Sequence, residues 1–291
     1  MAEDPKWQRA NTLISDRESP VAIIDVPASK LSISQTNAHL TPKAIRKAMA
    51  GFSTHSYTLE TSISDMTIQD LGEVQKPEDN EAETISRISS SGSQLVIALG
   101  GDNSITYAAA LGVFGDRLAS AGLITLDAHH DLRDGNSNGS PVRRLIEAGL
   151  NPKNIVQIGI NDFSNSSDYA NHARDLGITV ISRDQISKTG IEAACQQALE
   201  IAGSHGGPIH IDLDVDVCDQ SVVPACPAAA PGGISANEIR IAARMLASSV
   251  QVAGLDITEI DASRDSDDDR TVRLGALLVL EAVAGFGAFR R

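Results

Sequence analysis

Cysteine and long apolar runs are both scarce in this chain of 291 residues, and each scarcity excludes a class of protein. The three cysteines, Cys195, Cys218 and Cys226, are too few for a disulfide framework and lack the paired spacing of a structural zinc site. We therefore expect three reduced thiols in or near the core. No apolar run approaches the roughly 18 to 20 residues that cross a bilayer, so we expect no membrane span.

Positive charge is also in short supply. The chain has 24 Lys and Arg against 38 Asp and Glu, which gives a formal net charge of −14 at pH 7. Nucleic acids and anionic membrane surfaces bind to basic faces, and we expect neither as a partner. Residues 1–10 lack the basic and apolar regions of a secretory signal, which predicts a cytoplasmic protein.

What the chain does contain is an alternation of short aliphatic runs and amphipathic stretches. The aliphatic runs, which we predict to be strands, are residues 21–26, 95–99, 123–126, 155–160, 178–181, 209–215 and 252–257. The amphipathic stretches, which we predict to be helices, include residues 42–50, 141–148, 191–202 and 236–247. This pattern indicates an α/β fold with a parallel sheet covered by helices. Because no segment has the bias of a linker, we expect one domain over residues 1–291.

Two of the predicted helices have recognisable starts. Thr41 precedes Pro42 and has the chemistry of an N-cap residue, with proline at the first helical position. Ser235 is followed three residues later by Glu238, which is the pattern of a capping box.

Side chains that bind metals follow two of the predicted strands. The strand at residues 123–126 leads into Asp127, His129 and Asp131, which share one face if the extended geometry continues. The strand at residues 209–215 carries Asp212 and Asp214 with the same spacing of two. Polar residues also gather at strand ends simply because loops begin there, but the two patterns together favour a site.

Carboxylates packed at the carboxyl ends of parallel strands repel one another unless cations are bound. The four carboxylates nearly balance two divalent ions, and a set of oxygen and imidazole ligands suits Mn²⁺. Two bound metals can activate a water molecule near neutral pH. The sequence therefore predicts a hydrolytic centre.

Two further motifs follow predicted strands. Residues 100–104 read Gly-Gly-Asp-Asn-Ser, and the glycines allow close approach of the backbone to the same cleft, although a tight turn explains them equally well. Residues 254–261 end a strand with acids that include Glu259. A carboxylate there either binds a planar amidine through paired hydrogen bonds or lies on the surface.

Together these motifs resemble those of the ureohydrolase superfamily, which includes arginase, agmatinase and formimidoylglutamase. The matching segments, in the family's order, are GGDNS at residues 100–104, DAHHD at 127–131, DLDVD at 212–216 and DITEI at 256–260. The resemblance spans residues 21–281. It implies a three-layer α/β/α domain around a mainly parallel sheet of eight strands, two manganese ions per chain, and a homo-oligomer that is a trimer or hexamer.

The resemblance also implies roles for single residues. It makes Asp131 a group for proton transfer and Glu259 the group that holds the substrate's nitrogen. Asn103 stands where many members have a histidine ligand, and its amide oxygen is a weaker donor, so we expect one weakened metal site. The metal ligands that the resemblance implies are Asn103, Asp127, His129, Asp131, Asp212 and Asp214.

A second departure concerns the substrate. Arginases and agmatinases have a histidine near Asn138, whereas residues 137–143 resemble the corresponding segment of formimidoylglutamases. Arg133, Arg143 and Arg144 are candidate partners for a dianionic substrate tail, since guanidinium groups bind carboxylates through forked hydrogen bonds. The alternative is an exposed helix face, and we expect either Arg143 or Arg144 to face solvent. We expect His130 to be packed or to support the ligands, and His210 to be hydrogen-bonded within the sheet.

The sequence thus predicts hydrolysis of N-formimidoyl-L-glutamate to L-glutamate and formamide, a step of histidine degradation, by metal-activated hydroxide. Glu259 and Asn138 would contact the amidine, with Arg133 and Arg143 at the tail. One alternative is a ureohydrolase that releases urea from a guanidine compound, as an agmatinase, guanidinobutyrase or arginase does. Another is a metal-poor, catalytically silent binding protein, which Asn103 and the missing histidine at position 138 would explain.

Overall fold

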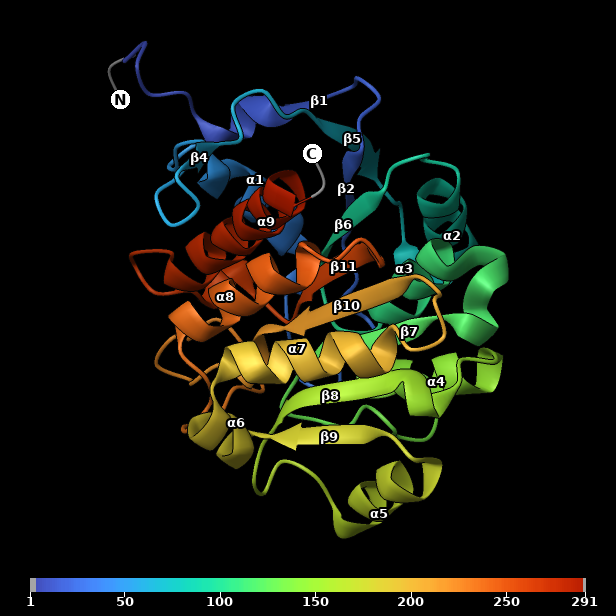
Figure 1. Cartoon of the computed structure of the whole chain (residues 1–291). Helices are drawn as coiled ribbons and strands as arrows, with labels where there is room; N and C mark the ends of the chain where they lie inside the picture. The colour runs from blue at the N-terminus through green and yellow to red at the C-terminus, as the bar shows by residue number, and fades with distance from the viewer. Residues whose placement is uncertain (1–3, 290–291) are drawn as a thin grey trace.

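A sheet of parallel strands runs through the computed structural model, which describes residues 4–289 (Figure 1). In the described residues the sheet has nine strands, and all of its strand pairs are parallel. Its spatial order is β1 (Ile14–Ser15), β5 (Ile68–Glu73), β2 (Val21–Val26), β6 (Leu95–Gly100), β11 (Val252–Thr258), β10 (Ile209–Asp214), β7 (Gly122–Leu126), β8 (Ile155–Ile160) and β9 (Thr179–Ser182). A separate antiparallel pair joins β3 (His55–Ser56) to β4 (Thr61–Ser62).

Helices cover both faces of the sheet, which confirms the predicted three-layer α/β/α architecture. One face is covered by α1 (Thr41–Met49), α6 (Arg183–Thr189), α7 (Ile191–Ala202), α8 (Ala236–Ala247) and α9 (Arg270–Phe289). The other face is covered by α2 (Glu81–Ser89), α3 (Ile105–Phe114), α4 (Pro141–Ala148) and α5 (Ser167–Leu176). Short 3₁₀ turns lie at η1 (Ala10–Leu13), η2 (Ala38–Leu40), η3 (Pro77–Asp79), η4 (Gly115–Ser120), η5 (Pro152–Asn154), η6 (Val215–Val217) and η7 (Ala262–Arg264).

The sheet has one strand more than the eight expected from the family resemblance. Strand β1 is a two-residue edge strand, too short to leave a pattern in the sequence. Strand β5 lies in the polar stretch 61–80, and all but its first residue are partly exposed, so it lacks an apolar run. All seven predicted strands are present with ends that differ by at most one residue. Six of them are buried on both faces, and the edge strand β9 has one buried residue, Ile181.

The two predicted helix starts had different outcomes. The capping box at α8 is confirmed, since Ser235 Oγ accepts from the N–H of Glu238 and the Glu238 side chain accepts from the N–H of Ser235. The N-cap at Thr41 is wrong, because α1 already includes Thr41 and no side chain caps it. The Thr41 hydroxyl instead donates to the carbonyl oxygen of Ile260, which anchors α1 beneath the loop that follows β11.

Helix α9 corrects the expectation that no apolar stretch reaches membrane length. The segment Arg270–Ala288 is long and apolar enough to cross a bilayer by length and composition, with a mean hydropathy of 1.5. However, 83% of it is buried inside the protein, where it packs against α1 and α8. Glu281 breaks the apolar run in the sequence, and both Arg240 and Arg244 of α8 lie 2.7 Å from its carboxylate. The helix is therefore a core element, apolar on most sides.

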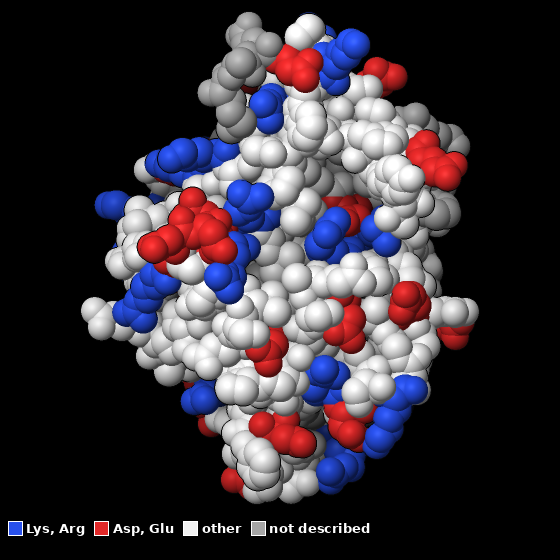
Figure 2. Space-filling view, turned by 90° about the vertical axis from the view of Figure 1, so that its left-hand side faces the viewer, with Lys and Arg blue, Asp and Glu red and all other residues white. Residues whose placement is uncertain are grey.

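The central strands align so that their carboxyl ends meet at one edge of the sheet. Asp212 of β10 lies beside Asp256 of β11 and Thr125 of β7, and β11 continues the alignment to β6. The arrowheads of β9 and β10 point left in Figure 1, and Figure 2 looks onto that side, where charges of both signs lie in separate small groups. The three cysteines are free and buried, as predicted.

Close packing at the start of β7 makes a testable prediction. A Cβ atom on Gly122 would lie 2.2 Å from the carbonyl oxygen of Ala202. A Cβ atom on Gly177, which has a left-handed φ of +81°, would have its nearest contact at 3.4 Å, with the side chain of Lys153. We expect Gly122→Ala to lower the free energy of unfolding by about 3 kcal/mol because the backbone must move, and Gly177→Ala by only about 1 kcal/mol because of its left-handed conformation. Urea denaturation measures both, and equal losses would contradict the packing described here.

Candidate metal centre and active site

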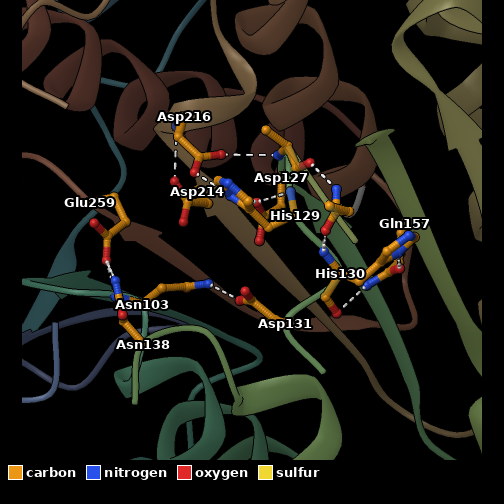
Figure 3. A network of polar contacts seen from close by, with 12 residues as sticks. Asn103, Asp127, His129, His130, Asp131, Asn138, Gln157, Asp214, Asp216 and Glu259 are labelled. Carbon is orange, nitrogen blue, oxygen red and sulfur yellow. Dashed lines mark hydrogen bonds and ion pairs between the residues drawn. The ribbon is translucent and has the colours of Figure 1, made fainter. Parts of the chain in front are cut away.

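The loop after β7 holds an imidazole between two carboxylates. His129 Nδ1 lies 2.8 Å from Asp216 Oδ2 and 3.3 Å from Asp127 Oδ1. The N–H of His129 donates to Asp127 Oδ1 at 2.7 Å, and the N–H of Ala128 donates to Asp216 Oδ1 at 3.0 Å (Figure 3). One ligand atom from each of Asp127, His129 and Asp216 lies within 4.8 Å of the others. These three residues could therefore hold a metal ion.

Asp216 is the site residue that the sequence reading missed. The alternation of side chains along an extended strand predicts Asp212 and Asp214 as ligands, but β10 ends at Asp214 and the alternation ends with it. The 3₁₀ turn η6 follows, and the N–H of Asp216 donates to Asp214 Oδ1 at 2.9 Å. The turn carries the Asp216 carboxylate to His129. The signal was present in the sequence, since DLDVD at residues 212–216 has three acids rather than two.

A second group of acids lies beside the first and shares Asp127 with it. One carboxylate oxygen from each of Asp127, Asp131 and Asp212 lies within 4.8 Å of the others. Asp131 is not on an extended strand, as the spacing argument assumed, because its φ is +53°. The left-handed turn nevertheless brings it to the cluster. Asp214 lines the neighbouring cavity.

Burial shifts the pKa values of the acids and of the imidazole in these two clusters. Burial, with the charge of Asp216, raises the pKa of Asp127 to about 7. Burial likewise raises the pKa of Asp131, Asp212 and Asp214 well above the usual value. Burial opposes the charge on His129, but hydrogen bonds to Asp127 and Asp216 raise its pKa to about 12. The raised pKa values mean that protons bind to these carboxylates and reduce their negative charge, which a divalent cation could neutralise instead. A set of oxygen ligands with one imidazole fits Mn²⁺.

Asn103 belongs to the centre, but its amide is turned away from the orientation that a ligand needs. Its Nδ2 donates to Asp131 Oδ2 at 2.6 Å (Figure 3). Its Oδ1 accepts from the hydroxyls of Thr106 at 2.8 Å and Thr258 at 3.0 Å. The oxygen is thus already hydrogen-bonded, and ligation through it, which stays a prediction, would require the amide to rotate.

Glu259 faces the cluster from the loop after β11. Its φ is +64°, and its N–H donates to the carbonyl oxygen of Gly101 at 2.9 Å. Glu259 Oε1 accepts from the N–H of Asn103 at 2.8 Å and from Asn138 Nδ2 at 2.9 Å. Burial raises the pKa of Glu259 to about 7 even though Asn138 favours the charged form. Both hydrogen bonds hold the carboxylate through Oε1, and among the described residues none donates to Oε2, which can therefore accept from a ligand's N–H.

A cavity of about 340 Å³ opens over the centre. Its lining includes four acids, His129, several uncharged polar groups and one arginine, Arg133; the acids are Asp131, Asp214, Asp216 and Glu259. Asn138 also lines it, and its Oδ1 accepts from the N–H of Ile33 at 3.0 Å, which fixes another part of the wall. The cavity could therefore hold a small molecule with a cationic head and an anionic tail.

The other two arginines do not line this cavity. Arg143 Nε donates to the carbonyl oxygen of Arg133 at 2.7 Å, so it supports the Arg133 loop from behind. Arg144 lies 2.7 Å from Glu81 and stacks on Tyr107. The expectation that one of the pair faces solvent is wrong, since their side chains are 18% and 17% exposed. Each has a partner that the sequence spacing could not reveal.

His130 and His210, the other two histidines discussed from the sequence, lie outside the cluster. His130 is buried, its Nδ1 lies 2.7 Å from Gln157 Oε1, and Gln157 Nε2 donates to the carbonyl oxygen of His130 at 2.9 Å. His210 is hydrogen-bonded within the sheet, with Nε2 at 2.7 Å from Asp256 Oδ2, as predicted.

Comparisons with known proteins show which proteins this chain is similar to. Residues 19–285 match the arginase family. The chain is 34% identical over 277 residues to a formimidoylglutamase of Bacillus subtilis, covering 91% of this chain and 86% of that one. The crystal structure of formimidoylglutamase from that organism superposes with a TM-score of 0.90 at 30% identity, covering 98% and 94% of the two chains. A formiminoglutamase of Trypanosoma cruzi, solved with Mn²⁺, has a TM-score of 0.88 at 21% identity, covers 96% and 98%, and so shares the fold.

The raised pKa values make metal binding depend on pH. Asp127 and Glu259, with pKa values of about 7 in place of 3.8 and 4.5, contribute stability at low pH that is lost as the pH rises through about 7. A cation competes with these protons and with the proton on His129. We therefore expect Mn²⁺ to raise the Tm, relative to EDTA, more at about pH 8 than at about pH 5.5. In Asp127→Asn the rise in Tm caused by Mn²⁺ should be smaller and should depend less on pH. A rise in the Tm of the native protein that is larger at low pH than at high pH would contradict this reasoning.

Proposed function

This chain belongs to the arginase family, and from that premise we propose that it hydrolyses N-formimidoyl-L-glutamate to L-glutamate and formamide. The observation that carries the proposal is the polarity of the cavity. The acids in its lining suit a cationic formimidoyl group, and Arg133 in the same lining suits the carboxylates of the glutamate moiety. The likeness to formimidoylglutamases over nine-tenths of the chain supports the same substrate.

We propose that the centre holds two manganese ions per chain. The carboxylates and imidazole that would hold them are Asp127, His129, Asp131, Asp212, Asp214 and Asp216. Asn103 would join them only if its amide rotated, because its oxygen accepts from Thr106 and Thr258. Bound divalent ions would supply Lewis acidity and lower the pKa of a water molecule to near neutrality. The two clusters that share Asp127 support the number of ions proposed.

The chain's own groups position the substrate and move the proton. Glu259, fixed by Asn138 and by the N–H of Asn103, accepts hydrogen bonds from the amidine nitrogens. Asp131 is buried in the lining of the same cavity, and burial raises the pKa of its carboxyl above the usual value, which favours its acceptance of a proton from the attacking water. We assign to it the delivery of that proton to the departing nitrogen of glutamate.

At the tail, Arg133 would pair with a substrate carboxylate, while Arg143 would act through Arg133. Arg143 donates to the carbonyl oxygens of Arg133 and Gly135, so it holds the loop from which Arg133 reaches the cavity. In this proposal Arg143 is a positioning residue.

We further propose that residues 1–291 form a single ureohydrolase-like domain that works in the cytoplasm as a homo-oligomer, a trimer or a hexamer. Residues 1–3 and 290–291 lie outside the described residues. Neither nucleic acid nor membrane enters the proposal, in keeping with the net charge of −14.

The substrate is tested directly by product analysis. Manganese-loaded protein is incubated separately with N-formimidoyl-L-glutamate, agmatine, arginine and guanidinobutyrate, and glutamate, formamide and urea are measured. We expect equal amounts of glutamate and formamide from the first compound and no urea from the others. Urea release would keep the chemistry but replace the substrate, and inactivity towards all four compounds in metal-loaded protein would contradict the proposal.

The tail contact is tested by substitution. Arg133→Ala should raise KM for N-formimidoyl-L-glutamate roughly tenfold or more with a smaller change in kcat, because an ion pair formed in both the ground state and the transition state is lost. Arg144→Ala, which removes an arginine paired with Glu81 outside the cavity, is the matched control and should leave KM unchanged. Steady-state kinetics of both variants decide the point, and equal KM values would remove Arg133 from the tail pocket.

A further inference from the structure

A loop without regular secondary structure forms part of the cavity wall. Residues 31–37, which we call the wall loop, follow β2 and contain no helix or strand. Ile33 and Ser34 of this loop line the cavity, and Ile33 is 57% exposed. Because such a loop has no backbone ladder of its own, contacts with other segments must hold it in place.

The first half of the wall loop is held by Asn138. The N–H of Asn138 donates to the carbonyl oxygen of Leu31 at 2.9 Å, and the N–H of Ile33 donates to Asn138 Oδ1 at 3.0 Å. A Cβ atom on Gly139 would lie 2.7 Å from Arg133 Cδ and 3.3 Å from Ile33 Cδ1. The side chains of Ile33 and Arg133 therefore approach the same point, where Gly139 leaves room for both.

The second half of the wall loop is held by Asp261, which follows β11, is 0% exposed and does not line the cavity. Its Oδ2 accepts from the N–H of Asn37 at 2.8 Å and lies 3.5 Å from the Thr36 hydroxyl and 3.3 Å from Arg264 Nε. Its Oδ1 accepts from the N–H of Ser263 at 3.0 Å and from the Ser263 hydroxyl at 2.5 Å. Asn37 Nδ2 in turn donates to Ser263 Oγ at 3.0 Å. A buried carboxylate with donors on both oxygens is a strong anchor, because hydrogen bonds to a charged group are stronger than neutral ones.

The segment that carries Asp261 is itself fixed by other contacts. The N–H of Asp261 donates to the carbonyl oxygen of Ala225 at 2.9 Å, and the Thr41 hydroxyl donates to the carbonyl oxygen of Ile260. Glu259, two residues earlier, is held by its own hydrogen bonds. Loss of the Asp261 carboxylate would therefore release the wall loop and leave Glu259 in place.

We propose that Asp261 is a positioning residue for recognition of the substrate tail. It holds the wall loop so that Ile33 lies beside Arg133 in the wall of the cavity. There Ile33 excludes water from the ion pair between Arg133 and a substrate carboxylate, which strengthens the pair because the local dielectric constant falls. This inference rests on the proposed function and deepens it, since the tail contact of Arg133 belongs to that proposal.

Steady-state kinetics of Asp261→Asn test the role of this carboxylate, because the change keeps the size and replaces one acceptor oxygen with a donor. KM for N-formimidoyl-L-glutamate should rise about fivefold or more while kcat changes less than about twofold, since a tail contact contributes equally to binding in the ground state and the transition state. Asp265→Asn is the matched control. Asp265 accepts from the Thr271 hydroxyl and from the N–H of Val272, both at 2.8 Å, and within residues 4–289 it has no hydrogen bond to the wall loop. Its substitution should leave KM unchanged.

A double variant separates positioning of the loop from general support of the fold. Ile33→Ala should raise KM by about as much as Asp261→Asn, and its side chain is exposed enough for the fold to tolerate the change. When the two changes are combined, their effects on KM should not add, because both act on one contact. A KM that rises by the product of the two single effects overturns the inference.

Hydrogen exchange of the full chain without substrate tests the anchor without turnover. A peptide covering residues 31–40 should exchange at least about tenfold faster in Asp261→Asn than in the native chain, and a peptide covering residues 127–131 should not change. Ser263→Ala removes one hydrogen bond to Asp261 and one from Asn37 at an exposed residue. It should shift KM and the exchange of residues 31–40 in the same directions, and it carries the test if Asp261→Asn does not fold.

Native KM in folded Asp261→Asn, or native exchange of its residues 31–40, overturns the inference. A lower kcat at unchanged KM overturns it as well, since Asp261 would then act through Glu259. A native chain that does not cleave N-formimidoyl-L-glutamate contradicts the proposed function, and hydrogen exchange still decides whether Asp261 anchors the wall loop. Normal cleavage by the native chain with an unchanged KM in Asp261→Asn contradicts this inference alone.

Discussion

The repulsion among carboxylates buried at one edge of the sheet is the constraint on which the rest of the site depends. Asp127, Asp131, Asp212, Asp214 and Asp216 are all nearly inaccessible to solvent. Burial and the charges of neighbouring carboxylates raise the pKa of Asp127, Asp131, Asp212 and Asp214. Bound protons and the charge on His129 offset part of the repulsion among the carboxylates. Buried carboxylates that lie this close together need compensating positive charge. The residues whose repulsion lowers the stability of the fold are therefore suited to bind divalent cations.

The sheet makes this concentration of charge possible. Parallel strands direct all their carboxyl ends to one edge, and the loops after β6, β7, β10 and β11 converge there. Two of the loops use left-handed residues, Asp131 and Glu259, to turn a carboxylate towards the centre. On both faces, helices exclude water from the strands, so the charges act on one another with little screening.

The same cavity combines two kinds of charged group. The acid Glu259 is held by the backbone N–H of Asn103 and the amide of Asn138. The arginine, Arg133, lies on a loop that Arg143 supports from outside. Because Glu259 follows β11 and Arg133 follows β7, the two contacts come from different loops and can vary independently.

The sequence by itself determined the α/β class, seven of the strands and most of the residues of the centre, because two-sided burial and the spacing of acids after strands are local patterns. It did not reveal β5, whose partly exposed residues carry no apolar signal. Nor did it reveal the partners of two arginines: Arg143 donates to the backbone of Arg133, across a loop, and Arg144 pairs with Glu81, which lies far from it in the chain. Asp216 and Asn103 show most clearly what only the tertiary structure decided. The turn η6 breaks the alternation that selected Asp212 and Asp214, and two threonines from α3 and β11 set the direction of the Asn103 amide. The contact of Asp216 with His129 and that of Asn103 with Thr258 join segments that are distant in the sequence, and spacing along the chain carries no information about them.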